Sequence, residues 1–399
     1  MKHRRILSGL AALMLAASLP MSALAREWDI ADGDITIVAD NDGQKVSQGT
    51  ENDISDDNPI IIGNSATNTV SIVAEKDQTA NVTLSGANID GSTKGNAAVS
   101  TTGEGNVSIE LDGDSTLKSG FCHAGLEKNN GGSLTIADED KNGKLTAEGG
   151  GYGAGIGGGY NGTGSDITIS GGEVNATGGA YGAGIGGGWG GSGSDITISG
   201  GEVKATGGSY GAGIGGGYSG DGSDITVSGG EVKATGGVNS AGIGGGLQGK
   251  GKDITVSGDA KLKVQGGVES WTGGAGAGIG NGGSKADGNQ IPGAEVEPDT
   301  SDLTTGWIEY YAPGADMDKD APSQTIVGTY IPPQPAREAA APAQPTAPLY
   351  RVTDGDGKDV SYETTWRDGV LTVTVEADRA VLTGRLSGIV GTQLEFLEP

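Results

Sequence analysis

The sequence predicts an all-β protein whose main part is a single-stranded parallel β-helix, a solenoid with 29-residue coils and three short strands per coil. Three observations lead to this fold class. A unit recurs almost verbatim from Asp166, Asp195 and Asp224, and the length of this constant period is typical of solenoid repeats. Within the unit, apolar residues alternate in short runs, which indicates strands and not helices. Glycine accounts for 80 of the 399 residues, and it returns at fixed positions where each coil must turn.

The three strands of one coil follow from alternating apolar pairs. These pairs, each bounded by Gly, Ser or Asn, are Ile167/Ile169, Val174/Ala176 and Ala183/Ile185. Such a strand cannot bury its apolar face alone, so successive coils must stack and share one core. Less regular copies of the first pair begin at Val82, Val107 and Leu134, and Ile254 continues the series. About seven coils at a strand spacing of roughly 4.8 Å predict a rod about 34 Å long.

The glycine-rich turn contains G-x-G-x-x-G at Gly153, Gly155 and Gly158. A dinucleotide-binding turn with this motif lies between a strand and a helix, and an acidic residue follows about 20 positions later. No amphipathic helix pattern follows any copy, and the motif recurs at Gly182 and Gly211. The glycines are therefore expected to serve tight corners and close backbone approaches, and no nucleotide site is expected.

The N-terminal segment 1–25 has the pattern of a secretory signal peptide. Lys2, Arg4 and Arg5 precede an apolar run over 6–19, and an Ala-Leu-Ala segment at 23–25 marks the cleavage site expected before Arg26. The formal charge of the chain is −26, and removal of this segment leaves 22 basic and 51 acidic residues, a charge of −29. Nucleic acids and anionic membrane surfaces are therefore not expected as partners. No later stretch is apolar enough to span a bilayer, so we expect a secreted, extracellular protein.

Composition divides the chain into five expected parts, which are a signal peptide (1–25), the parallel β-helix (26–282), a C-terminal cap of the helix (283–331), a Pro/Ala-rich linker (332–348) and a small β module (349–399). Trp307, Tyr310 and Tyr311 are expected to cover the open end of the rod, because unpaired strand edges promote fibre-like growth. A final strand is expected near Thr325. The linker is expected to be semi-extended.

The most suggestive outward residues are aromatic, and they lie on both sides of the glycine motif. Tyrosines precede it and Tyr or Trp follows it, at Tyr152, Tyr181 and Tyr210 and at Tyr160, Trp189 and Tyr218. They flank a nearly bare glycine floor, a shape that can hold the flat faces of pyranose rings between aromatic walls. A spacing of one strand separation equally allows the rings to stack on one another for stability. These six residues are the candidate carbohydrate-binding site, with structural stacking as the alternative.

A candidate calcium site lies in the segment DEDKNGKL. Asp138, Asp140, Asn142 and Gly143 match the first six positions of a calcium-binding loop. The match fails at position twelve, which is Gly149. An Asn-Gly hairpin turn that joins two strands explains the same residues. Both alternatives stay open at this stage, and Ca²⁺ is the only cofactor that the residues suggest.

Few residues in the rod suit catalysis. The chain after the signal segment has one histidine, His123, and no arginine from 27 to 336, which excludes an arginine-based lyase but not a lysine-based one. The adjacent carboxylates Asp56 and Asp57 lie in an Asp/Asn-rich stretch that is expected to be a solvated turn. The single cysteine, Cys122, cannot form an internal disulfide and is expected to be buried as a small apolar residue. We therefore expect a protein that is not an enzyme.

The repeated unit ITISGGEVxATGGxxGAGIGGG resembles one found in exported proteins of gut Firmicutes, which are described as carbohydrate-binding domain-containing proteins. Within that group, the clostridial polygalacturonate-binding proteins are parallel β-helices that bind acidic plant polysaccharide with calcium and do not cleave it. The resemblance covers roughly residues 26–330. It implies a secreted, non-catalytic protein that binds polysaccharide, with acidic pectin-type glycans as partners. The alternatives are a structural or adhesive cell-surface rod and, second, a polysaccharide lyase-like enzyme.

Overall fold

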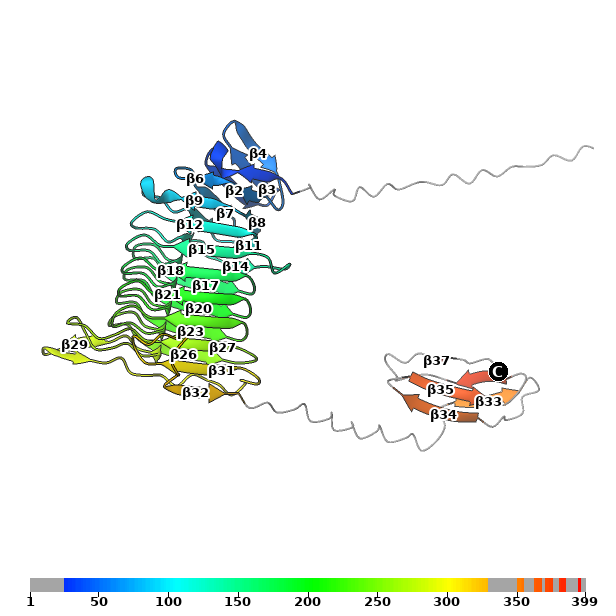
Figure 1. Ribbon diagram of the computed structural model, residues 1–399. Coiled ribbons are helices and arrows are strands. Elements are labelled where there is room, and N and C mark those ends of the chain that lie inside the picture. Colours follow the sequence, from blue (N-terminus) through cyan, green and yellow to red (C-terminus); the bar gives the residue numbers. More distant parts are fainter. Residues whose placement is uncertain are drawn as a thin grey trace, which may run out of the picture. The chain divides into compact units, whose positions relative to one another are not determined.

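The computed structural model describes residues 25–328 and, beyond them, the backbone of five strands between 350 and 395. The chain divides into two compact units, Met1–Tyr330 and Ile331–Pro399. Residues 1–24 of the expected signal peptide and the expected linker at 332–348 lie outside the described residues. The first unit is a parallel β-solenoid, as the sequence predicts, and Figure 1 shows its strands stacked as rungs along a rod.

Three sheets form the sides of the solenoid. The first sheet has nine strands, in the order β1 (Glu27–Asp29), β5 (Ile60–Ile62), β8 (Thr79–Ser85), β11 (Asn106–Asp112), β14 (Leu134–Ala137), β17 (Gly164–Ile169), β20 (Gly193–Ile198), β23 (Gly222–Val227) and β26 (Gly251–Val256). This sheet has two strands more than the seven coils expected. The additional strands β1 and β5 were missed because their buried residues, Trp28 and Ile61, fall in no recognisable repeat.

The second sheet contains the shortest strands. From the C-terminal end it runs β28 (Ile279–Gly280), β25 (Ile243–Gly244), β22 (Ile214–Gly215), β19 (Ile185–Gly186), β16 (Ile156–Gly157), β13 (Leu126–Lys128), β10 (Val99–Gly103), β7 (Val70–Ala74) and β2 (Ile35–Asp40), and then the antiparallel β3 (Gly43–Gln48) and β4 (Glu51–Ser55). In the regular coils these strands have only two residues, so the turns on either side of them lie close together.

The third sheet completes each coil. It runs β6 (Asn64–Ser65), β9 (Asn88–Asp90), β12 (Asp114–Lys118), β15 (Lys144–Glu148), β18 (Glu173–Thr177), β21 (Glu202–Thr206), β24 (Glu231–Thr235), β27 (Lys261–Gln265) and β31 (Trp307–Tyr311), and then the antiparallel β32 (Gln324–Val327). Two 3₁₀ turns, Ile30–Asp32 and Gly91–Thr93, are the helices of the described residues. No helix in this part of the chain has the length and apolarity to cross a membrane.

The coils stack in register with the repeat. Ile167 pairs with Ile196, its counterpart in the next copy of the unit, and Ile225 and Ile254 continue the column. All the apolar residues that the alternation assigned to the inside are buried, and all of them except Ala183 belong to one continuous core along the rod. Outward residues form columns in the same way, including Glu173, Glu202 and Glu231. Lys144 forms an ion pair with the first of these, 2.6 Å from its carboxylate.

Glycine permits the close approach of successive coils. A Cβ atom added at Gly208 would lie 1.5 Å from the carbonyl oxygen of Gly179, and one added at Gly237 would lie 1.6 Å from that of Gly208. No side chain fits at such a distance, so this column must consist of glycine. The motif glycines are stacked in the same way, because a Cβ atom added at Gly211 would lie 1.9 Å from the carbonyl oxygen of Gly182. The G-x-G-x-x-G pattern thus serves stacking, and a two-residue strand lies within each copy where a nucleotide-binding fold would begin a helix.

The N-terminal end is closed by the antiparallel strands β2, β3 and β4. Trp28 is buried there, and its Nε1 donates a hydrogen bond of 2.9 Å to a carboxylate oxygen of Asp56. Asp56 is only 1 % exposed, so the expectation that it lies in a solvated turn was wrong. It is buried because the indole N–H and two backbone groups satisfy its oxygens.

The C-terminal end differs in part from the expected cap. β31 is a further parallel rung on β27, and its Ile308 continues the core. β32 pairs antiparallel with β31 and is the final strand expected near Thr325. Between β28 and β31, the hairpin of β29 (Ser284–Ala286) and β30 (Asn289–Ile291) projects from the rod.

The described part of the second unit consists of strands, in agreement with the expected all-β module. β33 (Tyr350–Asp354) pairs antiparallel with β36 (Ala380–Gly384). β35 (Val370–Val375) pairs antiparallel with β34 (Tyr362–Arg367) and parallel with β37 (Leu394–Glu395).

Candidate functional site

The six predicted aromatic residues lie in the two turns that flank the two-residue strands of the second sheet. The first file, Tyr152, Tyr181 and Tyr210, lies before these strands, and the second file, Tyr160, Trp189 and Tyr218, lies after them. The backbone joins the files, because Trp189 N donates to Tyr152 O and Tyr218 N donates to Tyr181 O, both at 2.8 Å. Trp189 and Tyr218 are thus each fixed beside a tyrosine of the first file in the preceding coil.

The two files form a single aromatic surface. Neighbouring ring centroids within each file lie 5.4 to 6.0 Å apart. Contacts between the files are equally close, because the Tyr181 ring lies 4.5 Å from Trp189 and 5.8 Å from Tyr218. The expectation of two walls with a gap for a sugar ring between them was therefore wrong. The short strands bring the turns so close that the rings fill this gap themselves, and the stacking alternative describes their contacts.

Phe121 extends this surface by one coil and was missed in the sequence. Its ring centroid lies 4.4 Å from that of Tyr152, with an edge-on geometry. We call these seven residues the aromatic ribbon: Phe121, Tyr152, Tyr160, Tyr181, Trp189, Tyr210 and Tyr218. Phe121 precedes the first copy of the glycine motif by a whole coil, so its position became visible only when the register was known.

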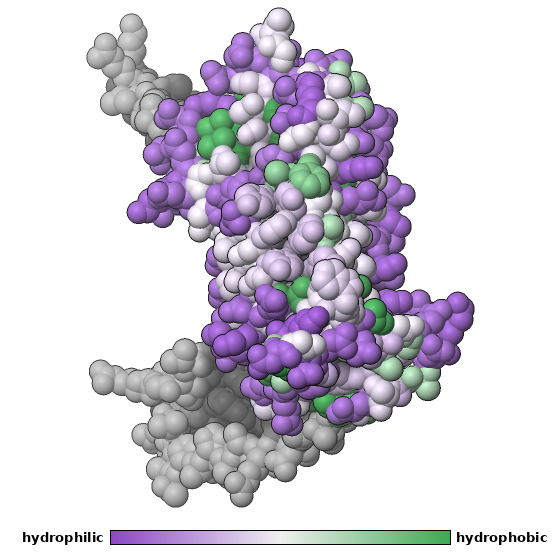
Figure 2. Space-filling model, turned by 90° about the vertical axis from the view of Figure 1, so that its left-hand side faces the viewer, coloured by the Kyte–Doolittle hydropathy of each residue, from purple (hydrophilic) through white to green (hydrophobic). Residues whose placement is uncertain are grey.

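The ribbon keeps part of its surface in contact with solvent. Phe121 is 61 % exposed and Tyr160 is 51 % exposed, whereas the other five rings are half-buried by one another. Figure 2 views the left-hand side of the rod in Figure 1 and shows a pale band of near-neutral residues along the axis, between hydrophilic margins. Glycine, tyrosine and tryptophan have such near-neutral hydropathies. Flat ligands thus have access to the outer faces and edges of the rings.

A shallow groove runs along the rod axis, and its lining residues come just before the tyrosines of the first file in the sequence. It spans four coils with a volume of about 590 Å³ and is floored by paired glycines such as Gly207 and Gly208. Ser209 and Val238, which lie in its wall, directly precede the positions of the first file in their coils. The groove offers space for an extended chain parallel to the ribbon.

Cys122 occupies the position of the first file in the coil before Tyr152. Its carbonyl oxygen accepts from Tyr160 N, as that of Tyr152 accepts from Trp189 N. Its side chain is exposed, so the expectation that it is buried was wrong. The physical reason is that positions of this file point out of the coil. No sequence signal marked this coil, because it lacks the glycine motif.

His123 is held by a buried carboxylate at the same end of the ribbon. Its Nδ1 lies 2.8 Å from Oε2 of Glu127, which is 6 % exposed. Ala124 N and Asn129 Nδ2 also donate to this carboxylate. A paired histidine of this kind suits general acid–base chemistry.

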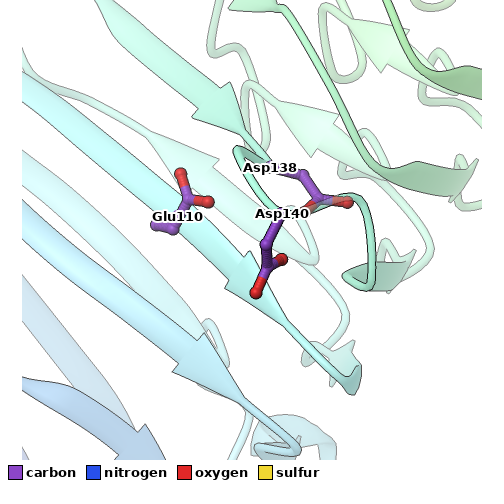
Figure 3. A group of neighbouring side chains, drawn as sticks. All are labelled: Glu110, Asp138 and Asp140. Carbon is purple, nitrogen blue, oxygen red and sulfur yellow. The ribbon is translucent and has the colours of Figure 1, made fainter.

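The predicted calcium ligands are brought together only in part. Figure 3 shows Glu110 of β11 beside Asp138 and Asp140, and the carboxylate oxygens of the three lie within 4.8 Å of one another. Asn142 donates from Nδ2 to Asp140 at 2.8 Å. Glu110 was missed, although register predicts it: β11 pairs with β14 so that Glu110 lies opposite Ala137, next to Asp138.

The turn at Asn142 has a different geometry from the expected hairpin. Asp138 accepts from Asn142 N and Gly143 N at 3.3 and 3.0 Å, and the segment leads from β14 of the first sheet to β15 of the third. It is therefore a corner between sheets. Three convergent carboxylates suit a hard cation such as Ca²⁺. They lie at the corner between the first and third sheets, whereas the ribbon flanks the second.

The repulsion among these carboxylates leads to a prediction for Glu110. Its pKa is raised by burial and by the neighbouring Glu139, Asp138 and Asp140. A raised folded-state pKa means that this group's contribution to stability is lost as the pH rises from the ordinary glutamate range through the raised value. Glu110→Gln should therefore raise the stability of the metal-free protein at neutral pH, by no more than about 1 kcal/mol because partly exposed charges are screened.

In the presence of Ca²⁺, wild type should be more stable than Glu110→Gln, the opposite of the order expected without metal. Wild type should gain thermal stability on Ca²⁺ addition, whereas Glu110→Gln should gain much less, because one charged ligand is lost. Glutamine keeps the oxygen that accepts from Glu139 N. Thermal melts at pH 5 and pH 7 with Ca²⁺ or EDTA measure both effects. An equal calcium shift in the two proteins would contradict a role of this trio.

Comparison with known proteins supports the fold. The beta helix repeat family matches residues 141–160, 167–189, 196–218 and 225–247. These segments cover most of the regular coils and all of the aromatic ribbon except Phe121. No curated protein and no solved structure matches the chain.

Proposed function

We propose that this protein is a secreted, non-catalytic polysaccharide-binding protein whose binding surface is the aromatic ribbon. The observation that carries the proposal is the alignment of seven contacting rings along the rod axis, beside a glycine-floored groove. Pyranose rings have flat apolar faces, which pack on tyrosine and tryptophan as other flat apolar groups do. A row of such rings suits a chain of sugars better than a single sugar.

Pectin-type acidic glycans are the ligand class that the resemblance of the repeat implies. Because the secreted chain without its signal segment would carry 22 basic and 51 acidic residues, a formal charge of −29, binding of an acidic glycan would depend on a cation to offset the repulsion. The trio of Glu110, Asp138 and Asp140 is the proposed calcium site of the described residues. Since it lies away from the second sheet, calcium at this site would stabilise the rod and would not bridge a glycan to the ribbon.

The alternative is a structural or adhesive surface rod. The contacts among the ribbon rings favour it, because they stabilise the stack without any ligand. The second alternative is a polysaccharide lyase-like enzyme, for which a lysine base stays open.

A glycan array with purified protein, in Ca²⁺ and in EDTA, tests the proposal. Binding to one class of linear polysaccharide, without release of new reducing ends or unsaturated products, is expected. Absence of binding to any glycan would favour the structural rod, and cleavage products would favour the enzyme.

A further inference from the structure

The last regular coil carries an insertion at the position of the first aromatic file. Ile243 of β25 pairs with Ile279 of β28, so this coil is longer than the preceding one, in which Ile214 pairs with Ile243. The additional residues lie between Gly267 and Gly276, because these glycines stack on Gly237 and Ser240 of the coil before. The corresponding turns of earlier coils contain the tyrosines of the first file.

The insertion presents a tryptophan at its tip. Ser270 N donates to Gly273 O at 3.0 Å, and Gly273 N donates to Ser270 O at 3.1 Å. These bonds close a two-residue turn formed by Trp271 and Thr272. Trp271 is 78 % exposed, more than any ring of the aromatic ribbon.

A buried asparagine holds this turn from beneath. Asn239, which continues the first file one coil beyond Tyr210, is fully buried. Its Nδ2 donates to the carbonyl oxygens of Gly273 and Gly274, and its Oδ1 accepts from Ser270 and Thr272. Up to Tyr210, the residues of the first file stack their rings on one another. In the next coil, Asn239 takes the same position and anchors the insertion by hydrogen bonds instead.

The hairpin of β29 and β30 supports the turn from the side. Lys285 Nζ donates to the carbonyl oxygen of Trp271 at 3.0 Å, and Gln290 Nε2 donates to that of Ser270 at 2.6 Å. The backbone around Trp271 is therefore fixed while its indole is left in solvent. Such preorganised exposure is typical of a binding anchor, because little ordering entropy is lost when a ligand packs on it.

We propose that Trp271 is the terminal stacking platform of the glycan-binding surface, so that the surface runs along the rod axis from Phe121 to Trp271 and selects long linear glycan chains. This inference rests on the proposed function. Five coil steps separate the two residues, a distance of about 24 Å along the axis. Chains that reach both ends gain a contact that short oligomers cannot make, so affinity rises with chain length.

Calorimetric titration with a length series of the glycan found on the array tests this inference. Trp271→Ala is compared with wild type, with Trp271→Phe, which keeps an aromatic ring, and with Ile291→Ala, a matched change of an exposed apolar residue on β30. For long oligomers, Trp271→Ala should bind about three- to tenfold more weakly. Short oligomers should bind all four proteins equally, and the other two variants should keep most of the gain with length.

The possible results separate this inference from the proposed function. The inference is overturned if the affinity of Trp271→Ala rises with oligomer length as it does in wild type, or if the variant loses the same factor of affinity at every length. Either result leaves the aromatic ribbon as the binding surface. A wild-type protein that self-associates in solution, with Trp271→Ala monomeric and unaltered in glycan binding, assigns the tryptophan to contacts between copies and also overturns it. A wild type that binds no glycan of any length overturns both proposals.

Discussion

Replacing Tyr181, Trp189 and Tyr210 together with leucine is expected to abolish glycan binding while the solenoid stays folded. Three central rings of the surface would be lost, so affinity should fall at least about 100-fold. Leucine keeps apolar burial at these half-buried positions, and the chain itself has the buried Leu247 in the second file after Tyr218. Titration with the array-selected polysaccharide measures the loss, and circular dichroism reports the fold.

Two further variants make this result specific. Thr197→Val changes an outward column of the first sheet and should leave binding unaltered. The corresponding triple alanine variant should lose stability as well, by roughly 0.5 to 1.5 kcal/mol for each stacked pair removed. If the triple leucine variant binds glycan as tightly as wild type, the aromatic ribbon is not the binding surface.

Gly208→Ala is expected to be strongly destabilising. The added Cβ would lie 1.5 Å from the carbonyl oxygen of Gly179, and both groups are backbone that cannot rotate away. Successive coils would have to separate locally, which disturbs their hydrogen bonds and core contacts. We expect a loss of more than about 3 kcal/mol in the free energy of unfolding, measured as a lowered denaturant midpoint.

Ser209→Ala is the matched control, because it alters the adjacent exposed residue of the same turn. Its free energy of unfolding should stay within about 0.5 kcal/mol of wild type. Equal midpoints for the Gly208 and Ser209 variants would show that the coils do not approach each other at this column.

The solenoid could be predicted because the 29-residue repeat and the alternation of apolar residues both indicate stacked strands. Inward positions such as Ile167 and Ile169 are fixed by period two, and the constant repeat length places each over its copy. The end structures could not be predicted in this way. Trp28 and Asp56 meet only through the antiparallel strands at the N-terminal end, and no repeat relates them.

The candidate site could be predicted residue by residue but not in its geometry. Position next to the glycine motif identified six ribbon residues. The sequence separation of Tyr181 and Trp189 gave no sign that their rings touch, because this depends on a strand of only two residues between the turns. Glu110 could have been found, since the spacing of the irregular coils already places it opposite Ala137.

Hydroxyl-radical footprinting of the wild type, with and without a saturating amount of its polysaccharide, tests the central claim most directly. Oxidation of each aromatic side chain is measured by mass spectrometry of peptides. The account predicts that bound polysaccharide protects Tyr160, Trp189 and Tyr218, whereas Trp307 of β31 is unaffected. Unchanged oxidation along the aromatic ribbon, with protection confined to another face of the rod, would contradict it.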